Sequence, residues 1–126
     1  MKVPSSGMAR LVPLPPAELH ILMALATGDK HGYAIMQQVA QETEGQVRMG
    51  PGTLYGTIKR LRESRFIVES KGQARGRGDD ERRRYYRLTA PGRKVLSAEL
   101  DRLAAVVRLA RSAGLMGSNV LAGEGA

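Results

Sequence analysis

The sequence has no cysteine and no tryptophan, and its 126 residues include only one phenylalanine and two histidines. Without cysteine, the chain can form neither a disulfide framework nor a thiolate metal site. It lacks any run of about 18 apolar residues, so we expect no membrane-spanning helix. Four prolines interrupt residues 1–16, which excludes the continuous apolar segment of a signal peptide. We therefore expect a soluble cytoplasmic protein with one modest hydrophobic core.

Catalytic motifs are also missing, because no HExxH, GxSxG or Walker phosphate loop occurs. His31 precedes a glycine at the start of a predicted helix and is expected to pack or cap rather than bind a metal. The consecutive acids Asp79, Asp80 and Glu81 alternate in direction on an extended chain and stand among arginines. They indicate a solvated charge run. The sequence thus predicts no enzyme, no cofactor and no metal site.

Positive charge is concentrated in the middle of the chain. Between Arg48 and Lys94 there are fourteen Lys and Arg against five Asp and Glu, whereas the flanking segments carry −1 and 0. The whole net charge of +8 therefore arises from this one segment. Basic charge confined to one region is typical of a surface that binds a polyanion such as nucleic acid.

Three helices are predicted in the first half of the chain. Residues 1–13, with several Pro, Ser and Gly, are expected to be a flexible arm. Pro15 and Pro16 can open a helix whose apolar stripe would be Leu19, Leu22, Met23 and Ala26, ending at Gly28 and Asp29. A second helix spans about 31–44, with Gly45 as its cap. The third, about 51–65, has a narrow apolar stripe formed by Leu54, Ile58 and Leu61.

A hairpin and a final helix are predicted in the second half. The extended runs 66–71 and 83–89 flank a Gly-rich, charged segment at 72–82. Thr89 can cap a helix over 90–112, and residues 113–126 are expected to be a disordered tail. The predicted fold is therefore mainly α with a small β-hairpin wing. A winged helix-turn-helix domain over 14–89 is followed by a C-terminal helix.

In this architecture the third helix enters the major groove of DNA, since its diameter matches the groove width. The face opposite its apolar stripe carries the candidate DNA-binding residues Thr53, Tyr55, Gly56, Lys59 and Arg60. The hydroxyls can contact phosphates or bases, the glycine permits close approach, and the cations suit phosphate or guanine. A plain solvated helix face is the alternative, which an exposed tyrosine beside a glycine disfavours.

The segment 72–78, GQARGRG, suits the tip of a wing. Arginines separated by glycines can reach into a narrow minor groove, where the negative potential is strongest. Arg75 and Arg77 are therefore the candidate wing contacts, with a solvated loop as the alternative.

Four segments in order resemble the PadR family of transcriptional regulators: HGYAI at 31–35, GPGTLY at 50–55, Leu61, and RYYRLTAPG at 84–92. The resemblance covers roughly residues 17–112, and the single C-terminal helix is similar to the short subclass of that family. It implies a winged-helix repressor that dimerises through its last helix and binds an inverted-repeat operator. Many members have Pro at the position of Gly56 and Gly at the position of Arg65, so Arg65 is expected to avoid a positive φ.

The last helix independently predicts a homodimer. Leu96, Leu100, Leu103, Val107 and Ala110 step by four and three residues, as in the seam of a short coiled coil. We expect this seam to be exposed in one protomer and buried by a second. Two-fold symmetry would then place two recognition helices about 34 Å apart on double-stranded DNA, with the bound protein associated with the nucleoid.

Two matters stay open at the level of sequence. A winged helix can also bind RNA or a protein partner, because a fold does not determine a function. A small-molecule effector of unknown identity could occupy a cleft between the last helix and the DNA-binding domain. With one Phe, four Tyr and no Trp, the sequence does not indicate an aromatic-lined drug pocket.

Overall fold

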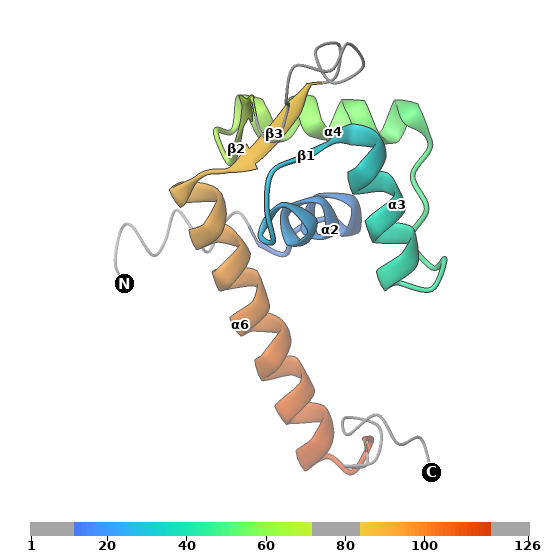
Figure 1. The fold of residues 1–126 in the computed structure, drawn as a ribbon. Helices are drawn as coiled ribbons and strands as arrows, with labels where there is room; N and C mark the ends of the chain where they lie inside the picture. The colour runs from blue at the N-terminus through green and yellow to red at the C-terminus, as the bar shows by residue number, and fades with distance from the viewer. Residues whose placement is uncertain (1–11, 72–83, 117–126) are drawn as a thin grey trace.

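The computed structural model describes residues 12–71 and 84–116 (Figure 1). Within these ranges the elements are α2 (Pro16–Leu25), β1 (Lys30–His31), α3 (Gly32–Glu42), α4 (Pro51–Glu63), β2 (Ile67–Ser70), β3 (Tyr85–Leu88) and α6 (Ala90–Ser112). The predicted order of three helices, a hairpin and a long helix is confirmed. The predicted arm and tail lie mostly outside the described residues, as does the loop 72–82.

The helix α2 lies at the centre of the fold and contacts α3, α4, α6 and β3 (Figure 1). Its buried side chains are Ile21, Leu22, Ala24 and Leu25. The predicted stripe was therefore partly wrong, because Met23 is 37% exposed and Leu19 is only partly buried. A helix that is surrounded by several elements buries more than one narrow stripe of side chains. In α2 the buried face includes Ile21 and Leu25, which the predicted stripe did not contain.

The sheet has three antiparallel strands in the order β1, β3, β2. Ile67 pairs with Leu88 and Ser70 with Tyr85 in the predicted hairpin. The strand β1 was not predicted. Its two residues, Lys30 and His31, pair with Tyr86 and Tyr85 and attach the connection between α2 and α3 to the sheet.

The helix α4 ends in a Schellman motif, with the N–H of Phe66 donating to the carbonyl of Leu61 at 3.0 Å and that of Arg65 to Arg62 at 2.9 Å. Arg65 takes the left-handed position with φ 68°, so the expectation that it avoids a positive φ was wrong. The side chains of Leu61 and Phe66, the first and last residues of this turn, are both buried, and their burial stabilises the turn. At the end of α3, Glu44 holds the corresponding position with φ 54°, directly before the predicted cap Gly45 with φ 82°.

The start of α6 is joined to this same turn. Thr89 caps α6 as predicted, because its side chain accepts the N–H of Gly92 at 3.0 Å. Its hydroxyl also donates to the carbonyl of Arg65 at 2.7 Å, and its N–H donates to the carbonyl of Phe66 at 3.0 Å. Gly92 packs so closely on the Phe66 carbonyl and the Leu88 side chain that a Cβ would overlap both. The end of α4 and the beginning of α6 are thus one packed junction.

We predict that Gly92→Ala lowers the free energy of unfolding by about 1–3 kcal/mol, because the added methyl forces the junction apart. Gly56→Ala is the matched control. A Cβ at Gly56 meets nothing within 4 Å, so alanine in the middle of α4 should stabilise by about 0.5–1 kcal/mol. Denaturant unfolding of both variants measures the difference, and equal effects would contradict the junction as described.

Candidate nucleic-acid interface

The helix α4 begins at Pro51, where proline is tolerated because the first turn has no N–H partners. Its buried residues are the predicted Leu54, Ile58 and Leu61, together with Thr57. Thr57, which lies outside the predicted stripe, is 1% exposed. It follows Leu54 by three residues and so lies beside the stripe, where its Oγ1 accepts a hydrogen bond from Arg60 at 3.3 Å.

The opposite face of α4 carries the predicted DNA-binding residues. Thr53, Tyr55, Lys59 and Arg60 are exposed, and Gly56 is half-buried with open space outside it. Gly52 and Glu63 stand four residues from Gly56 and Lys59, so they share this face. Sequence reasoning missed both, although the helical spacing indicates them. The structure therefore brings five of the seven predicted residues together; Arg75 and Arg77 lie outside the described residues.

Glutamates of the same chain hold three arginines around this face. Arg60 Nε lies 3.6 Å from Glu18 of α2. Glu69 of β2 lies between two cations, 3.7 Å from Arg62 Nη2 and 3.6 Å from Arg84 Nε. Except at Glu18, these side chains are at least 39% exposed, and such surface ion pairs contribute at most about 1 kcal/mol each. A competing phosphate can therefore replace the glutamates at little cost.

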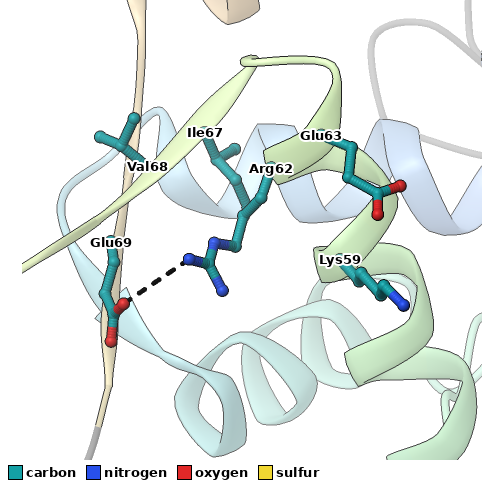
Figure 2. Close-up of a pocket in the computed structure, with 6 residues that line it drawn as sticks. All are labelled: Lys59, Arg62, Glu63, Ile67, Val68 and Glu69. Atoms are coloured by element: carbon teal, nitrogen blue, oxygen red, sulfur yellow. Dashed lines mark ion pairs between the residues drawn. The ribbon is translucent and has the colours of Figure 1, made fainter.

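A groove of about 450 Å³ separates the second half of α4 from β2. Figure 2 shows Arg62 pointing toward Glu69 from α4. Lys59, Glu63, Ile67 and Val68 complete its lining. The groove thus joins the exposed face of α4 to the first strand of the hairpin, with Lys59 and Arg62 as its cations.

The sheet is joined to the start of α3 through His31, which pairs with Tyr85 of β3. His31 caps α3, accepting the N–H of Ala34 on Nδ1 at 3.2 Å, so its interpretation as a packing or capping residue is confirmed. Its ring meets Tyr85 edge-on at 5.4 Å. Tyr86 and Leu88 of β3 are buried and belong to the core.

The predicted seam of α6 divides into two parts. Leu96 is 5% exposed and belongs to the core of its own chain, so its expected exposure was wrong. From Leu100, which is 39% exposed, the helix extends away from the other elements (Figure 1). Leu103, Val107 and Ala110 are half-buried there. Val106 and Leu109, which were not predicted, are 48% and 71% exposed and widen this apolar surface.

Glu99, also unpredicted, is a buried carboxylate at the point where α6 leaves the core, with 1% exposure. Arg102 donates to its two oxygens from Nε and Nη2 at 2.8 and 2.9 Å, and the backbone of Leu14 donates a further hydrogen bond. The Arg102 hydrogen bonds lower the pKa of Glu99, against the opposing effect of burial. The pair thereby ties the segment before α2 to α6.

A second groove, of about 470 Å³, lies between α2 and α6. Its apolar lining comes from Met23, Ala26, Leu96 and Leu100, and its polar lining from Thr27, Arg93, Ser97 and Asp101. It occupies the position of the cleft expected between the last helix and the DNA-binding domain.

Residues 21–98 match the model of the Transcriptional regulator PadR-like family. The chain is 36% identical over 90 residues to the transcriptional regulator Rv3488 of Mycobacterium tuberculosis, covering 71% of this chain and 78% of that one. It is 38% identical over 90 residues, 70% of its length, to an uncharacterized transposon protein of Streptomyces fradiae, of which it spans 23%. A PadR family transcription regulator from Clostridium difficile has a similar fold, with a TM-score of 0.65 at 22% identity, covering 78% of this chain and 97% of that one.

The chain therefore belongs to the PadR-like family of transcriptional regulators, as the resemblance implied. The predicted fold class, mainly α with a small sheet, is confirmed by the structure and its neighbours. Family membership implies regulation through DNA binding and confirms that the protein is not an enzyme. Among residues 12–71 and 84–116, no helix is long and apolar enough to cross a membrane, and no cluster of His, Asp or Glu suits a metal ion.

We predict that Glu99→Gln lowers the midpoint of thermal unfolding at neutral pH, since the variant loses the ionised acceptor of Arg102. A carboxyl whose pKa is lowered in the folded state stabilises the protein above its ordinary pKa. That contribution disappears as the pH falls from the ordinary pKa of glutamate through the lowered pKa of the folded state. The wild type and the variant should therefore differ at pH 7 and converge in acid. A difference that does not depend on pH would contradict the ionic role of Glu99.

Proposed function

We propose that the protein is a repressor that binds an inverted-repeat operator as a homodimer. The recognition helix, 51–65 by sequence and Pro51–Glu63 in the structure, would enter the major groove. The wing at 72–82, with Arg75 and Arg77, would contact the minor groove. Repression follows if the bound dimer occupies the promoter and excludes the polymerase.

The observation that carries this proposal is the two-sided character of α4. One side buries Leu54, Ile58 and Leu61 against the core, and the other exposes Thr53, Tyr55, Gly56, Lys59 and Arg60. Small residues at Gly52 and Gly56 leave the helix backbone accessible to base edges. The cations stand toward the second half of the helix, where phosphates flank the groove.

The arginine–glutamate pairs support a phosphate-binding role for the groove between α4 and β2. The arginine side chains are 43–67% exposed, so a phosphate can reach them from solvent. Glu69 holds Arg62 in the groove between α4 and β2, and Arg84 offers a second cation from the hairpin. Binding would exchange each weak ion pair for a charge-assisted contact with DNA.

The projecting part of α6 supports a dimer. An exposed apolar surface formed by Leu100, Leu103, Val106, Val107 and Leu109 is buried when a second copy packs on it. Two-fold symmetry then spaces the recognition helices about one turn of DNA, or about 34 Å, apart. The groove between α2 and α6 adjoins this surface at Leu100, so an apolar effector bound there would touch both the domain and the dimer helix.

The primary test is fluorescence anisotropy of the full chain with a duplex from its own promoter region, with random duplex as competitor, at two salt concentrations. We expect binding that survives the competitor at physiological salt, with two protomers per site. A single-stranded RNA of equal length at equal salt tests the alternative function. Preference for the RNA, or equal loss of both duplexes as salt rises, would overturn the proposal.

We predict that Lys59→Ala weakens binding to operator and random duplex alike and reduces the slope of log affinity against log salt by about one, since one phosphate contact is lost. Arg108→Ala is the matched control. It removes one positive charge from an exposed position in the second half of α6. The control should leave the salt slope unchanged. Equal salt slopes for the two variants would mean that Lys59 does not contact a phosphate.

We predict that Leu103→Glu converts the dimer into monomers, because it places a charge in the centre of the apolar surface of α6. Leu103 is not part of the buried core, so the variant should keep its fold. Arg108→Glu introduces the same side chain on the opposite face of the helix and should remain dimeric. Analytical ultracentrifugation at micromolar concentration measures both. A wild-type protein that sediments only as a monomer would refute the dimer itself.

A further inference from the structure

The first residue of α3, Gly32, lies directly against the ring of Tyr55 on α4. A Cβ built on Gly32 would stand 2.5 Å from the Tyr55 hydroxyl oxygen and 2.9 Å from its Cε1 and Cζ atoms. Those three atoms are the nearest neighbours of such a Cβ. The far end of the Tyr55 side chain therefore excludes a side chain at position 32. The contact joins residues that are 23 positions apart in the sequence.

The backbone itself does not require glycine at this position. Gly32 is absent from the glycines with positive φ, which are Gly28, Gly45 and Gly114 in the described part of the chain. As the first residue of α3, it also lies where alanine has a higher helix propensity than glycine. The missing side chain is therefore explained by the tyrosine ring rather than by a turn.

The start of α3 is a fixed support for that ring. His31 caps the helix through Ala34 and packs edge-on against Tyr85. The strand β1, which ends at His31, pairs with β3 on the same sheet. Gly32 is itself buried, although the Tyr55 side chain that covers it remains half exposed. The ring thus has a firm surface on one side and solvent on the other.

We infer that Gly32 is a positioning residue for Tyr55, and that its bare backbone sets the pose in which the recognition helix presents this ring and hydroxyl to DNA. The inference rests on the proposed function, in which Tyr55 contacts the operator. A tyrosine side chain has few rotatable bonds, so one rigid contact surface greatly restricts its orientations. A ring restricted before binding loses less conformational entropy when DNA binds.

An added methyl at position 32 should therefore act on DNA recognition rather than on folding. Because the clashing atoms are the end of a flexible side chain, the ring can swing toward solvent without a backbone shift. Gly32→Ala should keep the thermal unfolding midpoint of the wild type or raise it slightly. It should also lower affinity for the operator at least fivefold, with affinity for random duplex unchanged.

The decisive experiment is a double-mutant cycle of Gly32→Ala and Tyr55→Ala, measured by anisotropy on operator and random duplex and by thermal unfolding. Tyr55→Ala alone should lower operator affinity about tenfold or more. In that background Gly32→Ala should cost nothing further, since the ring it displaces is gone. In the NMR spectrum of the wild type, the Gly32 protons should show a ring-current shift that disappears in Tyr55→Ala.

The outcomes separate this inference from the proposed function. If Tyr55→Ala binds the operator as the wild type does, Tyr55 is not at the interface, and that part of the proposed function fails. If Tyr55→Ala is weakened but Gly32→Ala is not, the positioning role alone is wrong. Destabilisation by Gly32→Ala that persists in the Tyr55→Ala background would also overturn it. Destabilisation that Tyr55→Ala relieves would support the contact.

Discussion

The hydrogen bonds of Thr89 to the carbonyls of Arg65 and Phe66 determine how the two functional parts of this regulator are oriented. They join the turn that follows α4 to the residue that caps α6, and Gly92 allows these two segments to touch there. Arg65 is in the left-handed conformation, and its carbonyl and that of Phe66 both accept hydrogen bonds from Thr89. These contacts fix the end of α4 relative to the start of α6, and both helices pack on α2.

Elements with a strong local signal were predicted well from the sequence. Proline at Pro51 and the capping threonine Thr89 defined the starts of α4 and α6, because both signals act through neighbouring backbone groups. The exposed residues of α4 followed from its narrow apolar stripe, which leaves the opposite face of the helix to solvent. The family resemblance, confirmed by the match over residues 21–98, rests on the same segments.

What could not be predicted depends on contacts between distant segments. The strand β1 has two residues, too few to show an alternating pattern, and exists only because β3 lies beside it. Thr57 and Leu96 are buried on α4 and α6, which both contact α2, so their burial depends on how the helices pack. Arg65 has a positive φ in the turn that joins the buried residues Leu61 and Phe66. The contact of Gly32 with Tyr55 likewise depends on the crossing of two helices.

Because the start of α6 is joined to the turn after α4, the length of α6 determines which way its apolar surface faces relative to the rest of the domain. Each residue of an α-helix adds about 1.5 Å of rise and about 100° of rotation. Inserting one residue between Glu99 and Leu103 would therefore swing the apolar surface around the helix axis while the DNA-binding domain stayed in place. Two partners joined through that surface would then present their recognition helices on different sides of the duplex. In the proposed dimer, a change in the length of α6 would therefore keep the two half-sites in phase only if it added or removed whole helical turns.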